Sequence, residues 1–112
     1  MKSIKSRVPL ESEIQNMLCE YLALKKRFFW RNNNIPVFDS KTRSYRSMPK
    51  YAMKGVADII VITDGGFVCF IEVKRPKGKQ SEDQVEFERL CKKWGAEYHV
   101  IWSIEQLKEI GL

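Results

Sequence analysis

The spacing of apolar residues in the first quarter of the chain predicts an amphipathic helix followed by a strand. Between Pro9 and Lys26, apolar residues recur at intervals of three and four, which is the period of one face of an α-helix. The aromatic run Phe28-Phe29-Trp30-Arg31 is typical of a β-strand. A polar stretch from Asn32 to Lys54 follows, and Pro36 and Pro49 lie within it. We expect loops or a weak hairpin there.

The centre of the chain predicts a β-hairpin. Val56–Ile62 and Phe67–Lys74 are rich in β-branched and aromatic residues. Thr63-Asp64-Gly65-Gly66 separates them, and glycine supplies the positive φ that a tight turn requires. These two runs therefore form the predicted central pair of strands.

The last third of the chain predicts a helix, a strand and a short second helix. Ser81-Glu82-Asp83-Gln84 has the form of a capping box, and the helix that it opens ends near Gly95. Tyr98–Trp102 returns as a strand. Ser103-Ile104-Glu105-Gln106 repeats the capping pattern before a short helix that ends at Gly111. The element order is therefore αβ(β)ββαβα, which predicts an α/β fold.

Length and composition predict one domain. The chain has 112 residues, 44% of them hydrophobic, and shows no internal repeat or linker, so we expect a single domain spanning residues 1–112. The longest apolar run, Val56–Ile62, is interrupted by Asp58 and is far shorter than the roughly 20 residues of a membrane span. No apolar segment follows the basic start, residues 1–7, so a secretory signal is not expected. We expect a cytoplasmic protein.

The cysteines and the single histidine limit the chemistry. Cys19, Cys69 and Cys91 are widely spaced among apolar residues, which favours reduced core thiols over disulfides or a zinc knuckle. His99 is the one histidine of the chain, so a multi-histidine metal site is excluded. Catalysis, if present, must depend on carboxylates and lysines.

The charge is positive and concentrated. There are 20 Lys and Arg against 14 Asp and Glu, a formal net charge of +6, which favours a polyanionic partner such as nucleic acid. Nothing in the pattern indicates a recognition helix or a zinc finger, so we expect phosphate contacts and selection by DNA shape. The basic residues that flank the central strands are Arg31, Lys41, Arg43, Arg46, Lys50, Lys54, Arg75, Lys77 and Lys79.

Three charged residues within the apolar hairpin are the candidates for chemistry. Asp58, Glu72 and Lys74 are costly there unless something compensates them. If Thr63 pairs with Phe67 across a three-residue loop, the same register places Asp58 directly opposite Glu72. A two-residue loop would turn Asp58 to the other face. The register is therefore a structural test of any shared role for the two carboxylates.

Two carboxylates about 5 Å apart repel each other, and a hard divalent cation relieves that repulsion. Mg²⁺ or Mn²⁺ fits such a site and could polarise a phosphodiester, with Lys74 beside the reacting water in an electrostatic and orienting role. The simpler alternative is an ordinary cross-strand salt bridge formed by the same three residues.

The motif resembles that of a known nuclease superfamily. Gly55-Val56-Ala57-Asp58, then Glu72-Val73-Lys74, then Gln84 at the start of a helix are similar to the PD-(D/E)XK motif, with Ala57 in place of its proline. Further elements resemble the VRR-NUC family, the virus-type replication-repair nuclease domain, and the match spans nearly the whole chain. These are Glu13, Phe29-Trp30-Arg31-Asn32, Ile71-Glu72-Val73-Lys74 and Gly78-Lys79-Gln80-Ser81.

The resemblance implies a restriction-endonuclease-like core, a central mixed β-sheet flanked by helices, and a role for each matching residue. Asp58, Glu72 and the backbone carbonyl of Val73 would bind Mg²⁺ or Mn²⁺, and Lys74 would be the catalytic lysine. Glu13 would assist the metal or its water, and Gln84 would support the site. Glu13 could instead lie on a solvated helix face, and Gln84 could cap its helix through Ser81, or one side chain could serve both purposes in part.

The resemblance also implies an activity: structure-specific cleavage of branched DNA, with Holliday junctions as the substrate of a small stand-alone phage or bacterial member. The location would then be the cytoplasm of a bacterium or a phage-infected host. Because a junction is approximately two-fold symmetric, such an enzyme would act as a homodimer, to whose interface Phe28, Phe29, Trp30 or Trp102 could contribute.

Two alternatives stay open: a non-catalytic basic DNA-binding module, or a less selective flap, nicking or RNA-cleaving nuclease. One metal ion and two are both compatible with the sequence.

Overall fold

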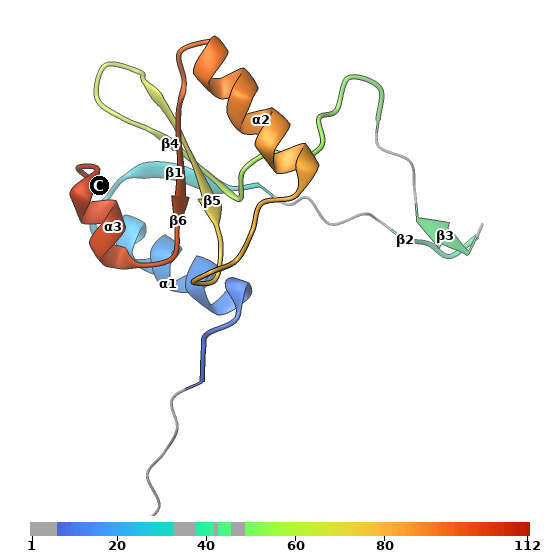
Figure 1. The fold of residues 1–112 in the computed structure, drawn as a ribbon, viewed down its shortest axis with the longest axis horizontal. Coiled ribbons are helices and arrows are strands. Elements are labelled where there is room, and N and C mark those ends of the chain that lie inside the picture. The colour runs from blue at the N-terminus through green and yellow to red at the C-terminus, as the bar shows by residue number, and fades with distance from the viewer. Residues whose placement is uncertain (1–6, 33–37, 42, 46–48) are drawn as a thin grey trace, which may run out of the picture.

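A mixed four-stranded sheet forms the centre of the molecule. The computed structural model describes residues 7–32, 38–41, 43–45 and 49–112 (Figure 1). The sheet has the strand order β1-β4-β5-β6, in which the first two pairs are antiparallel and β5 and β6 are parallel. The predicted mixed sheet is confirmed. Its strands are β1 (Phe28–Arg31), β4 (Ile59–Ile62), β5 (Val68–Val73) and β6 (Glu97–Ile101).

In the part of the chain that the structure describes, three helices cover the two faces of this sheet. They are α1 (Glu11–Leu24), α2 (Glu82–Lys93), which connects β5 to β6, and α3 (Ile104–Glu109). Because successive strand residues point to opposite faces, the odd-numbered and even-numbered positions of β4 and β5 enter different clusters. The first cluster joins odd-numbered residues such as Ile59 and Ile71 to α1 and α3. The second joins Phe70 and Tyr98 to Phe87 and Cys91 of α2.

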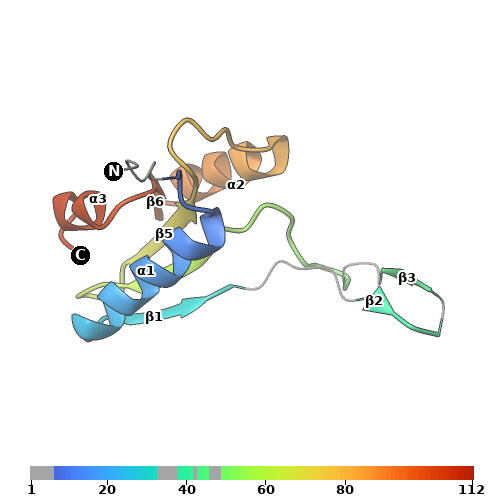
Figure 2. The ribbon, with the colours of Figure 1, turned by 90° about the horizontal axis from the view of Figure 1, so that it is seen from below.

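A separate two-stranded hairpin follows β1 along the chain. It consists of β2 (Phe38–Asp39) and β3 (Ser44–Tyr45), which pair in the antiparallel sense. In Figures 1 and 2 this hairpin lies well away from the four-stranded sheet. The weak hairpin predicted within the polar stretch is therefore confirmed.

The turn between β4 and β5 has the length on which the predicted register depends. The Thr63 N–H donates to the carbonyl oxygen of Phe67 at 2.8 Å, so residues 64–66 form the loop. Its two glycines have φ of +85° and +80°, values that L side chains rarely adopt. Ile59 pairs with Ile71, and the same register carried one residue back places Asp58 opposite Glu72.

Some element bounds differ from the prediction. The first helix covers residues 11–24 instead of 9–26, and the central strands are each shorter than the apolar runs that predict them. Trp94, which the helical period would place beside Phe87 on the core face, is 78% exposed because α2 ends at Lys93 and the chain turns away at Gly95 (φ +82°). Within the described ranges, no helix is both long and apolar enough to cross a membrane.

Candidate active site

Asp58 and Glu72 meet at the end of the β4–β5 hairpin. Asp58 directly precedes β4, and its Oδ2 accepts a hydrogen bond from the Val73 N–H at 2.8 Å. Glu72 is the next-to-last residue of β5 and is only 1% exposed. The strand backbone therefore fixes both carboxyl groups, one by its own hydrogen bond and one by its place in the sheet.

The Glu72 carboxyl lies in an environment that disfavours its charge. Burial raises its pKa most, and the neighbouring Asp58 carboxyl raises it further, to about 9, although the ammonium group of Lys74 acts in the opposite direction. One oxygen of Glu72, Oε2, is buried and has no hydrogen-bond donor among the described residues. This buried oxygen accepts no hydrogen bond and lies next to a second carboxyl group. Two such oxygen ligands are what a hard divalent cation requires.

Gln84 performs both of the roles that its position in the sequence allowed. Its side-chain Oε1 accepts from the Ser81 backbone N–H at 2.8 Å, and its backbone N–H donates to Ser81 Oγ at 3.2 Å. These two bonds complete the capping box of α2. Its Nε2 donates to Glu72 Oε1 at 2.7 Å. The same amide therefore closes the helix and orients the buried carboxyl.

Lys74 follows β5 and is nearly buried, at 9% exposure. Its Nζ lies 3.7 Å from Oε1 of Glu11, the first residue of α1. The carboxylate of Glu11 also contributes to the raised pKa of Glu72, so it belongs to the same group of charges. Sequence reasoning missed Glu11, since its position two residues before Glu13 carries no signal that favours one acid over the other.

Glu13 has different partners. Its carboxylate accepts two hydrogen bonds from Arg7, at 2.7 and 2.9 Å, and one from the Leu10 N–H at 3.2 Å. These bonds lower the pKa of Glu13, first through Arg7 and then through Leu10. The structure thus brings Asp58, Glu72, Lys74 and Gln84 together, whereas Glu13 contacts the chain that enters α1.

Gly55 sets the distance between the Gly55–Asp58 segment and α2. With φ of +74°, it packs so closely that a Cβ placed there would lie 2.3 Å from the Asp83 carbonyl oxygen. This contact holds the first turn of α2, and with it Gln84, against the segment that leads through Asp58 into β4. Ala57, at the position of the motif's proline, is fully buried in the cluster beneath α2.

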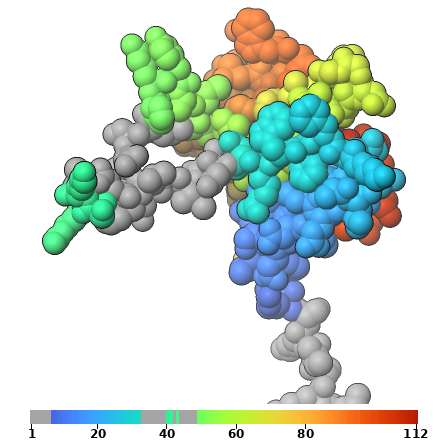
Figure 3. Space-filling model, turned by 180° about the vertical axis from the view of Figure 1, so that it is seen from behind, coloured from blue at the N-terminus to red at the C-terminus, as the bar shows by residue number. Residues whose placement is uncertain are grey.

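The predicted basic side chains are exposed wherever the structure describes them. Arg31 donates to Asn16 Oδ1 at 3.3 Å, and Arg75 donates to the Val8 carbonyl at 3.3 Å. Lys41 and Arg43 lie between β2 and β3 in the sequence. Figure 3 shows that this hairpin projects away from the body of the molecule. Arg46 lies outside the described residues. The exposed members are Arg31, Lys41, Arg43, Lys50, Lys54, Arg75, Lys77 and Lys79.

Comparison with solved structures identifies the fold. No family model matches the chain, and no curated protein sequence matches it. A solved structure described as a VRR_NUC domain is similar to it, with a TM-score of 0.61 and 22% sequence identity, over 89% of this chain and 91% of that chain. The chain therefore has an α/β fold of the PD-(D/E)XK type. More particularly, its architecture is that of a VRR_NUC domain, which confirms at the level of fold the resemblance carried by its motifs.

Proposed function

We propose that this chain is a Mg²⁺- or Mn²⁺-dependent endodeoxyribonuclease of the VRR-NUC kind. One observation carries the proposal: the buried Glu72 carboxyl faces Asp58 and is held by Gln84, with Lys74 in the same group of charges. A structural salt bridge would pair each carboxylate with a cation. Here the nearest ion pair of Lys74 is with Glu11, which leaves the two strand carboxyls facing each other.

Each residue of the candidate site has a separate proposed role. Asp58, Glu72 and the carbonyl of Val73 would hold the cation, and the donorless Oε2 of Glu72 fits that role. When bound, the cation supplies Lewis-acid stabilisation of charge on the phosphodiester. The Val73 N–H keeps Asp58 oriented, and Gln84 keeps Glu72 oriented. Lys74 would offer its ammonium group to the scissile phosphate and the attacking water, and Glu11 would orient that ammonium group.

The substrate we propose is branched DNA, and we propose a four-way junction in preference to a flap. Exposed basic side chains precede Asp58 and follow Lys74 in the sequence. We propose that these two groups contact phosphates of more than one duplex arm. A junction needs two coordinated cuts, so we propose a two-fold homodimer. The exposed Phe28, Trp30 and Trp102 side chains, between 42% and 67% exposed, are available to such an interface.

The test compares labelled four-way junction, flap and linear duplex with Mg²⁺, with Mn²⁺ and with chelator. Asp58→Asn is the inactive variant, and Asp64→Asn, in the exposed β4–β5 turn, is its matched control. We expect symmetric, metal-dependent junction cuts in the wild type and in Asp64→Asn, and none in Asp58→Asn. Light scattering of the protein and of the junction complex measures the dimer.

Two other results would change the proposal. Equal cleavage of flap and duplex would keep the nuclease and refute junction selectivity. Binding of all three DNA forms without cleavage under any metal would leave a basic DNA-binding module, in which the carboxyl pair is structural.

A further inference from the structure

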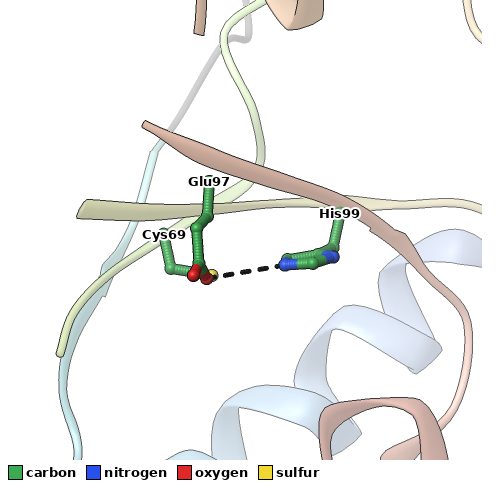
Figure 4. Close-up of side chains that lie close together, drawn as sticks. All are labelled: Cys69, Glu97 and His99. Atoms are coloured by element: carbon green, nitrogen blue, oxygen red, sulfur yellow. Dashed lines mark ion pairs between the residues drawn. The ribbon is translucent and has the colours of Figure 1, made fainter. Parts of the chain in front are cut away.

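A second cluster of ligand-type side chains lies on the parallel pair β5 and β6. Cys69 of β5 pairs directly with Glu97 of β6, and His99 follows two residues along on the same face of the sheet. Figure 4 shows the three side chains pointing toward one another. One ligand atom from each lies within 4.8 Å of the others, and His99 Nε2 is 3.6 Å from Glu97 Oε2.

This cluster is distinct from the nuclease site. Cys69 precedes Glu72 by three residues in β5, which separates their backbones by about 10 Å at the rise of a strand. An odd number of residues also puts the two side chains on opposite faces. Cys69 belongs to the core cluster shared with α1 and α3, whereas Glu72 is bonded to Gln84 of α2.

We infer that Cys69, Glu97 and His99 form a binding site for a borderline transition-metal cation of the Zn²⁺ type. Sulfur, imidazole nitrogen and carboxylate oxygen are the donors that Zn²⁺ takes, at bond lengths of about 2.0 to 2.3 Å. Tetrahedral geometry then separates neighbouring ligand atoms by roughly 3.3 to 3.7 Å. The 3.6 Å between His99 and Glu97 already meets this spacing, and the Cys69 sulfur lies within 4.8 Å of both other ligand atoms, so it must approach them by at most about 1 to 1.5 Å.

The exposure of the three side chains gives the cation a path and a fourth ligand. Cys69 is 2% exposed, but the side chains of His99 and Glu97 are 32% and 61% exposed. A cation therefore enters past the carboxylate and the imidazole, reaches the thiol last, and keeps a water on its solvent side. Three protein ligands with one open position is a known zinc arrangement.

The chemistry of the thiol explains why the cation must be soft enough to bind sulfur. Burial and the neighbouring Glu97 carboxylate raise the pKa of the Cys69 thiol to about 12, so a bound cation must displace its proton. Zn²⁺ and Co²⁺ form thiolate bonds, whereas Mg²⁺ prefers oxygen ligands and retains its waters. The two sites of this chain would thus separate soft from hard cations by their donors.

The experiment uses the full chain, stripped with chelator, dialysed and titrated with Co²⁺ and then Zn²⁺. We expect a thiolate-to-cobalt charge-transfer band that Zn²⁺ removes, at one equivalent. The band should be lost in Cys69→Ala and should require more than about tenfold higher Co²⁺ in His99→Gln, since a direct ligand contributes at least as much as an outer-shell partner. Asp58→Asn, at the nuclease site, and Cys91→Ala, a second buried thiol, are the controls that keep the band.

Zn²⁺-dependent thermal stabilisation is the second readout, and it uses the partly exposed His99, whose replacement leaves the core intact. We expect the stabilisation in the wild type and in Asp58→Asn, and its loss in His99→Gln. The inference is overturned by absence of the band in the wild type, by its survival in Cys69→Ala, or by equal Zn²⁺ stabilisation in wild type and His99→Gln. Zn²⁺ stabilisation that survives in His99→Gln but is lost in Asp58→Asn would assign the cation to the carboxylate site and would equally refute the inference.

Discussion

Replacing Glu72 by Gln should stabilise the metal-free protein while it removes the proposed activity. The substitution keeps the shape of the side chain and the acceptor that Gln84 uses, but it removes the ionisable group. The new amide can donate to Asp58, as the protonated carboxyl of Glu72 can, but it carries no charge at any pH. The buried carboxyl is therefore a cost to folding that the proposed cation site explains.

The size of the effect follows from the pKa of Glu72, about 9 in the folded chain against an ordinary value of 4.5. At pH 7 the folded chain keeps this proton and the unfolded chain has lost it, so ionisation favours unfolding. At 1.36 kcal/mol per pH unit, the cost that has accumulated between pH 4.5 and pH 7 is about 3 kcal/mol. For a domain of this size, Glu72→Gln should raise the melting temperature by up to about 10 °C.

The sign of the pH dependence is the sharper test. The folded-state pKa is raised, so the wild type loses stability relative to the variant as the pH increases from 4.5 towards 9. Thermal melts in chelator at pH 4.5, 7 and 8.5 should show the two proteins converging at the acid end. Glu109→Gln, an exposed carboxylate on α3, is the matched control and should show no such divergence. A melting difference that is independent of pH, or a variant less stable than wild type at pH 8.5, would refute the reasoning.

Three further predictions concern the rest of the site. Lys74→Met should lower the junction cleavage rate by about 100-fold or more, yet leave Mg²⁺-dependent thermal stabilisation intact, as single-turnover assays and melts would show. Glu11→Gln should reduce cleavage because Lys74 loses its partner at 3.7 Å, whereas Glu13→Gln, which disturbs a surface pair, should act on stability alone; the opposite ranking in the same assay would contradict the geometry. Gly55→Ala should cost about 1–3 kcal/mol in urea unfolding and also slow cleavage. Gly66→Ala shares the positive φ without any neighbour within 4 Å and should cost less; equal costs would show that the close contact contributes nothing.

The sequence limited the register of the central hairpin to two possibilities, one for a two-residue loop and one for a three-residue loop. The glycines of the turn are compatible with both, and the structure has the three-residue loop. The opposition of Asp58 and Glu72 follows from that register alone. The two contacts of Gln84 were likewise within reach of the sequence, because the capping box fixes its position on α2.

The choice between Glu11 and Glu13 could not be predicted from local pattern. It depends on how residues 7–10 enter α1, where Arg7 takes up the carboxylate of Glu13 and leaves Glu11 beside Lys74. The Cys69, Glu97 and His99 cluster was also hidden, since it requires the parallel register of β5 and β6, and the α2 crossover separates those strands in sequence. Long-range pairing of this kind leaves no periodic signature in the chain.

The side-chain amide of Gln84 makes hydrogen bonds to both Ser81 and Glu72, and this restricts which residues can keep the helix cap and the site together. Glu and Gln complete a capping box equally well, so an engineer who sought a more stable helix would regard the two as interchangeable at this position. Here a Glu would retain the acceptor for the Ser81 N–H but would have no N–H for Glu72, and it would bring a third carboxylate to a place that already holds two. Residue 84 is therefore more restricted than an ordinary capping-box position, and the difference between Gln and Glu there tests the contact with Glu72 separately from the helix cap.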